Sequence, residues 1–179
     1  MNWNIDTAHS YVEFSVRHLG ISTVKGRFKT FGGAALTDEA GNLKQFSAEI
    51  DPASIDTGAE KRDEHLRSPD FFDAQSFPKM QFTSSSITPL GGQRYRAEGT
   101  LTMHGVAKPV TLEVELEQTV KDPWGNTKLG ATATGRIKRS DWGLTWNQAL
   151  ETGGFLVSDD VKLVLEIQGG AAPAVATAK

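Results

Sequence analysis

Apolar and polar side chains alternate with a period of two residues along most of this chain, and this pattern limits the folds it can adopt. Between residues 110 and 117, Val110, Leu112, Val114 and Leu116 alternate with a threonine and three glutamates. Successive side chains of a β-strand point to opposite faces, so such a segment has one face to bury and one to expose to water. The same alternation occurs in the segments 11–18, 24–31, 46–51, 79–87, 94–105, 131–138 and 161–168.

Short stretches rich in Gly, Pro, Asn and Asp lie between these segments, and they predict tight connections. Roughly eight strands joined in this way are typical of an antiparallel meander that forms a barrel or a sandwich. The sequence therefore predicts an all-β protein, with the barrel and the sandwich as alternatives.

The length of 179 residues fits one domain with a substantial core, and we find no internal repeat or linker that would divide it. The final stretch, GAAPAVATAK, contains mostly small residues. We expect residues 1–169 to form a single domain and residues 170–179 to form a disordered C-terminal tail.

Composition excludes several classes of function. The chain has no cysteine, so disulfides, thiol chemistry and cysteine-bound metals are excluded. A net charge of −3 gives no general attraction to nucleic acid or to an anionic membrane. No stretch approaches the roughly 20 apolar residues of a membrane span, so no stable membrane insertion is expected. The first residues lack the pattern of a secretory signal, which predicts a cytoplasmic location, or a periplasmic one if the chain is a trimmed form.

One segment breaks the alternation and predicts a helix over residues 58–67. Thr57 and Glu60 have the spacing of a capping box, and Ser68-Pro69 ends the pattern. One face of this helix would combine apolar and charged side chains: Ala59, Arg62, Asp63 and Leu66, with His65 beside them. We expect a helix with so narrow an apolar face to lie across a barrel end as a lid, with its polar groups at the rim. The alternative is a solvated helix whose charges make only weak exposed ion pairs.

Side chains that could support catalysis or bind metal show no familiar spacing. The four histidines (His9, His18, His65 and His104) form no HExxH or HxH pair, and arginines lie next to or near two of them, His18 and His65. We therefore predict no metal site, with these histidines bonded to backbone or carboxylate groups instead. There is no GxSxG elbow and no phosphate-binding loop. Trp142 and Trp146 could form an aromatic shelf for a ligand or simply pack at the rim.

Several blocks, in order along nearly the whole chain, resemble the YceI-like family of polyisoprenoid-binding, lipocalin-like proteins. They are WNIDTAHSYVEFSVRHLGISTVKGRFKTFGG, KRDEHLRSPDFFDAQSFPKMQF, GTLTMHGVAKPVTL and SDWGL. The resemblance implies an eight-stranded antiparallel lipocalin-like barrel with a short helical insertion closing one end. It also implies an apolar bore that holds a linear isoprenoid lipid, either a polyprenyl diphosphate or an isoprenoid quinone precursor. No catalytic residue and no cofactor are implied, and members often form homodimers.

On this resemblance, the lipid head group is assigned to polar residues in the family's blocks: His18, Arg62, His65 and His104. The lipid tail is assigned to apolar positions of the alternating strands and of the insertion: Phe14, Val16, Phe28, Phe46, Phe72, Met80, Phe82, Leu101, Met103, Leu112, Val114, Leu163 and Leu165. For each of the latter, ordinary core packing is the alternative. Two other functions stay open: an enzyme acting on a lipidic substrate with His18, Asp63 and His65 as acid–base groups, and a stress-related structural or interaction barrel.

Overall fold

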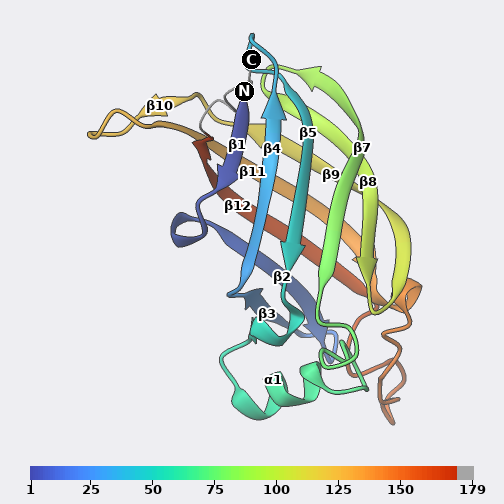
Figure 1. Cartoon of the computed structure of the whole chain (residues 1–179). Helices are drawn as coiled ribbons and strands as arrows, with labels where there is room; N and C mark the ends of the chain where they lie inside the picture. Colours follow the sequence, from blue (N-terminus) through green and yellow to red (C-terminus); the bar gives the residue numbers. More distant parts are fainter. Residues whose placement is uncertain (173–179) are drawn as a thin grey trace.

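The alternating segments form one antiparallel sheet that closes on itself (Figure 1). The structure is a computed structural model, and it describes residues 1–172. Its elements are β1 (Asn2–Ile5), η1 (Thr7–His9), β2 (Tyr11–His18), β3 (Ser22–Phe28), β4 (Phe31–Thr37), β5 (Leu43–Ile50), η2 (Pro52–Ser54), β6 (Ile55–Asp56), α1 (Glu60–Arg67), β7 (Met80–Gly91), β8 (Arg94–Met103), β9 (Val106–Leu116), β10 (Val120–Lys121), β11 (Thr127–Lys138), η3 (Arg139–Trp142) and β12 (Asp160–Ala171). No helix among these residues is long and apolar enough to cross a membrane.

Pairing of β11 with β12 closes the barrel, from Lys128 opposite Gly170 to Lys138 opposite Asp160. Two pairs of short strands each act as one long strand. β1 and β2 both pair with β12, and β3 and β4 pair with β2 and β1 respectively. With β5, β7, β8, β9, β11 and β12, they make an eight-stranded antiparallel barrel. This confirms the prediction of an all-β barrel with a helical insertion and resolves the choice between barrel and sandwich.

Two predicted boundaries were wrong in detail. The helix begins at Glu60, not at Gly58, and Ala59 is its N-cap with no side-chain hydrogen bond, so the expected capping box does not form. The last strand continues through Gly170 and Ala171, which pair with β1 rather than starting a tail. The rest of the predicted tail, residues 173–179, lies outside the described residues.

The end of the barrel that holds the start of β1 and the end of β12 is filled by large side chains. Trp3 and Tyr95 are only 3% and 2% exposed, and Leu43 and Leu116 are buried with them. The indole Nε1 of Trp3 donates a 3.0 Å hydrogen bond to Oγ1 of Thr37, which satisfies its one polar atom inside the core. We call this the closed end.

The strands separate at the other end, which we call the mouth. There β3 pairs with β2 on one side and with the short strand β6 on the other, whereas β5 pairs with β4 and β7. The segment containing α1 crosses this end of the barrel, as predicted from the narrow apolar face of the helix (Figure 1). We call residues 57–77 the lid segment.

Candidate functional site

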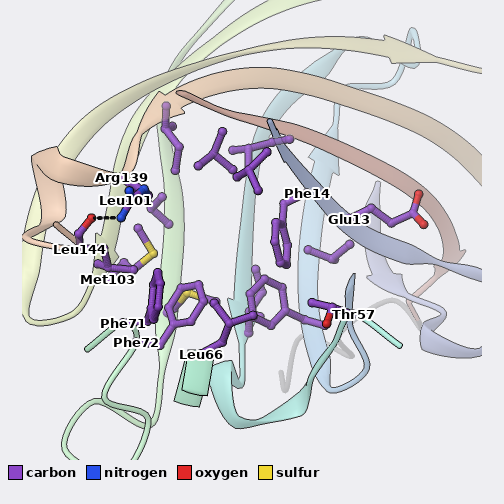
Figure 2. A pocket seen from close by; sticks show the side chains of 18 of the residues that line it. Glu13, Phe14, Thr57, Leu66, Phe71, Phe72, Leu101, Met103, Arg139 and Leu144 are labelled. Atoms are coloured by element: carbon purple, nitrogen blue, oxygen red, sulfur yellow. Dashed lines mark hydrogen bonds between the residues drawn. The ribbon is translucent and has the colours of Figure 1, made fainter. Parts of the chain in front are cut away.

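A cavity of about 370 Å³ lies inside the mouth half of the barrel, between the sheet and the lid segment (Figure 2). Inward-facing residues of β2, β3, β5, β7, β8, β9, β11 and β12 form its walls. Most of the residues that line the cavity are apolar. Those with charged or strongly polar side chains are Glu13, His18, Thr57, Arg62, His65 and Arg139. The carboxylate of Glu13 points away from the other lining side chains. Such a space favours an apolar ligand.

Most residues predicted for the tail do line this cavity. They are Phe14, Val16, Phe28, Phe46, Phe72, Met80, Phe82, Leu101, Met103, Leu112, Leu163 and Leu165. Val114 does not. It faces inward, but it lies next to Tyr95 in the sheet and belongs to the packed closed end. The cavity is therefore blind, and it ends at about the level of Leu112.

Glycines in the wall leave room for neighbouring side chains. A Cβ added at Gly26 would overlap the ring of Phe14, one at Gly99 would overlap the ring of Phe82, and one at Gly135 would overlap a methyl group of Leu112. Each large side chain thus occupies the space above a glycine on an adjacent strand, instead of extending across the barrel. The interior is hollow at this level because these positions carry no side chain.

The lid segment supplies the outer wall of the cavity. Leu66, Phe71 and Phe72 lie together below the barrel interior in Figure 2. The ring of Phe72 meets that of Phe28 edge to face at 5.7 Å, and Phe28 lies 5.6 Å from Phe14. These aromatic contacts join the lid segment to β2 and β3 without a covalent or polar link.

A buried carboxylate fastens the start of the lid segment. Asp63 is 4% exposed, and its Oδ1 accepts hydrogen bonds from the backbone N–H of Thr57 at 2.9 Å and from the Thr57 hydroxyl at 2.6 Å. The hydroxyl of Thr57 in turn accepts a 2.7 Å hydrogen bond from Nε of Arg62. These charge-assisted bonds take the place of the predicted capping box and fix the angle at which α1 leaves β6.

A buried arginine holds residues 143–158, most of the irregular chain between η3 and β12, which we call the mouth loop. Arg139 is 6% exposed, and one terminal nitrogen donates 2.8 Å hydrogen bonds to the carbonyls of Leu144 and Trp146. Its Nε donates a 3.0 Å bond to the Ser158 carbonyl. Burial lowers the pKa of Arg139 below its ordinary value, and the charge of Asp159 partly offsets this. The guanidinium stays protonated at neutral pH.

An aromatic cluster links the lid segment to the mouth loop. The imidazole of His65 lies 4.8 Å from the indole of Trp146 and 5.1 Å from the ring of Phe71, and those two rings are 5.3 Å apart. Nε2 of His65 also lies 2.8 Å from Oδ2 of Asp70. The mouth is therefore covered by two segments that meet through side chains. Neither segment forms a strand here, although Val157 of the mouth loop makes an isolated β-bridge with His18.

The predicted head-group residues divide into two groups. His18, Arg62 and His65 line the cavity at the mouth. His104 does not: its Nδ1 lies 2.9 Å from the carbonyl oxygen of Trp142, and its ring packs edge-on against Phe77 at 5.0 Å. His104 lies in the turn between β8 and β9, outside both strands, so the alternation along β8 does not direct its side chain into the cavity.

The alternative acid–base set is not brought together. His18 and His65 line the cavity, but Asp63 does not and is held by Thr57. Among residues 1–172 there is no group of three or more His, Asp or Glu side chains placed to hold a metal ion.

The predicted head-group and tail sets omit several residues that line the cavity, among them Phe71, Arg139, Leu144, Leu156 and Val157. Four of them lie in irregular chain or in the lid segment, where no periodicity indicates a direction. The tryptophans separate in the structure. Trp142 is 1% exposed and donates to the Leu101 carbonyl, whereas Trp146 faces the cavity.

Comparison with known proteins places this barrel in a family. The model of the YceI-like domain matches residues 3–169. The chain belongs to the YceI-like family. A UPF0312 protein of Staphylococcus aureus (strain N315) is 40% identical over 167 residues, which cover 90% of this chain and 92% of that protein.

Solved structures share this fold. The crystal structure of Burkholderia cenocepacia BcnA is 28% identical, with a TM-score of 0.80, and the match covers 92% of this YceI-like chain and 98% of that one. A polyisoprenoid binding domain from Saccharophagus degradans is 16% identical with a TM-score of 0.71, and the match covers 95% and 98% of the two chains. The second likeness shows the fold alone.

Proposed function

We propose that this protein binds a linear isoprenoid lipid in the barrel cavity and carries or stores it without changing it chemically. The observation that carries this proposal is the blind apolar cavity, whose polar side chains gather at the mouth. A long apolar tail with one polar end has the matching distribution of polarity. The fold is also that of the polyisoprenoid binding domain from S. degradans.

Burial of the tail supplies enough free energy for binding. Each methylene group removed from water contributes about 0.8 kcal/mol, so one isoprene unit contributes a few kcal/mol before ordering costs are subtracted. Several units bind without any specific polar contact. Affinity should therefore rise with each added unit until the tail reaches the packed side chains of Tyr95 and Val114, and then level off.

The head group, a diphosphate or a quinone-type ring, would lie beside His18, Arg62 and His65. Arginine forms forked hydrogen bonds that suit phosphate oxygens, and Arg62 is exposed at the mouth. The homodimer and the cytoplasmic location remain predictions from the resemblance and from the sequence.

Native mass spectrometry of the delipidated protein, reloaded with linear isoprenoid alcohols from detergent solution, tests the proposal. The wild-type protein should retain one lipid per chain. Ala48→Phe should lose this retention, because Ala48 lines the cavity and a ring there fills it. Gln45→Phe adds the same ring at an exposed position of β5 and is the matched control, which should retain the lipid.

Two results would contradict the proposal. One is a wild-type protein that holds no isoprenoid at any chain length. The other is an Ala48→Phe variant that folds and retains the lipid as well as wild type.

A further inference from the structure

Two segments at the mouth leave large apolar side chains in solvent. Ile21 is 79% and Leu19 is 41% exposed in the turn between β2 and β3, and Phe155 of the mouth loop is 65% exposed. The segments are neighbours, because the backbone N–H of Leu19 donates a 2.8 Å hydrogen bond to the carbonyl of Leu156. We call Leu19, Ile21 and Phe155 the mouth rim.

The mouth rim is continuous with the cavity. His18 precedes Leu19 and lines the cavity, and Leu156 follows Phe155 and lines it as well. His18 also forms an isolated β-bridge with Val157, another lining residue. In Figure 1 the mouth loop extends below the barrel at the same end as α1 and next to the end of β2. Exposed apolar side chains therefore border directly on the apolar interior.

Two cationic side chains lie immediately behind the rim on the outer face of the β2–β3 hairpin. The guanidinium of Arg17 donates 3.0 Å hydrogen bonds to Oγ1 of Thr23 and to the carbonyl of Gly20, which holds it at the turn. Lys25 is exposed on β3, opposite Ser15 of β2. This order matches the surface of a bilayer. The apolar side chains of the mouth rim would lie in the hydrocarbon, and the two cations would lie beside the phosphate groups above it.

We propose that the mouth rim inserts into the surface of a lipid bilayer, so that the cavity opens towards the hydrocarbon layer that supplies or receives its lipid. This inference rests on the proposed function, because a long isoprenoid tail partitions into membranes and reaches a carrier from there. A bilayer suits this surface better than a protein partner does. A stable protein interface needs roughly 800 Å² on each side, whereas a few apolar side chains with nearby cations suffice for reversible membrane binding.

Flotation of the lipid-free full chain with phosphatidylcholine vesicles, alone and with phosphatidylglycerol added, tests the inference. The wild-type protein should float with both, and more strongly with the anionic vesicles. The double variant Ile21→Ser/Phe155→Ser should reduce the membrane-bound fraction by roughly tenfold or more, because two large apolar side chains no longer leave water. Lys25→Gln should reduce only the gain from the anionic lipid.

The chain provides a matched control at the opposite end. Trp124 is 85% exposed in the hairpin between β10 and β11, which lies by the closed end. Trp124→Ser should float as wild type does. If the wild-type protein does not float, or if Trp124→Ser weakens flotation as much as the rim variant, the inference is overturned.

Loading from detergent solution separates the two proposals. The rim variant should still take up isoprenoid from detergent at the wild-type level, because its cavity lining is intact, but it should take up lipid from vesicles more slowly. A protein that takes up no isoprenoid from detergent contradicts the proposed function, whatever its flotation. Equal uptake from vesicles by the rim variant and wild type contradicts the inference alone.

Discussion

The two ends of the barrel use the same alternation of inward and outward side chains, yet one is filled and the other hollow. At the closed end Trp3 and Tyr95 are almost completely buried, whereas at the mouth Phe14 and Leu163 are only partly buried and face the cavity. The closed end is filled by its own large side chains. The mouth is covered by the lid segment, which Asp63 holds, and by the mouth loop, which Arg139 holds. Alternation decides which side chains face inward, but the size of each inward side chain and the cover at the end decide whether the interior is empty.

Truncating a large side chain should therefore cost more stability at the closed end than at the mouth. Trp3→Ala should lower the free energy of unfolding by about 3–5 kcal/mol, because it leaves a void in packed surroundings and removes the partner of Thr37. Phe14→Ala should lower it by less than half as much, since Phe14 already faces a cavity. Urea denaturation measures both. Equal losses would show that the mouth is packed as tightly as the closed end.

Removing the guanidinium that holds the mouth loop should have the next largest effect. Arg139→Met leaves the carbonyls of Leu144, Trp146 and Ser158 without their donor, at a cost of about 2–3 kcal/mol in stability. Hydrogen exchange in residues 143–158 should speed up while the β-strands stay protected. Arg136→Met, at an exposed position of β11, is the control and should change little. Unaltered exchange in the mouth loop of Arg139→Met would remove Arg139 from this role.

The bond between Thr57 and Asp63 should matter less for stability and more for the lid segment. Thr57→Val keeps the shape but removes the hydroxyl that donates to Asp63, which should cost about 1–2 kcal/mol. Amides of residues 57–77 should exchange faster, and a bound isoprenoid should dissociate faster. Thr132→Val, at an exposed position of β11, tests whether any threonine would behave in this way. If both variants behave alike, the buried carboxylate does not fasten the lid segment.

Replacing one glycine of the cavity wall by alanine should change the affinity for isoprenoid more than it changes the free energy of unfolding. In Gly26→Ala, the atoms nearest to the new Cβ are those of the Phe14 ring and a methyl group of Thr57, and both belong to side chains that can move. Stability should change by less than about 1 kcal/mol, while the displaced ring enters the cavity and weakens isoprenoid binding several-fold. Gly32→Ala, where a Cβ meets open space, should leave binding unchanged. Equal affinities in titrations of the two variants would contradict this account of the hollow interior.

The sequence supported the strands, the inward faces and the place of the lid segment, because these follow from local periodicity. The sequence did not show how far from the mouth each inward-facing residue lies. Leu112 and Val114 share one face of β9, but only Leu112 lines the cavity, since Tyr95 occupies the space beside Val114. It also did not indicate Arg139, because the carbonyls that bind it belong to an irregular loop. The lining of the mouth depends on contacts between distant segments, which periodicity does not encode.

A crystal structure of the protein loaded with geranylgeraniol tests the central claim most directly. The account predicts continuous elongated density that begins at the mouth near His65 and Trp146, passes between Phe14 and Phe82, and stops before Tyr95. An interior filled by the protein's own side chains, with the isoprenoid bound outside the barrel, would contradict it.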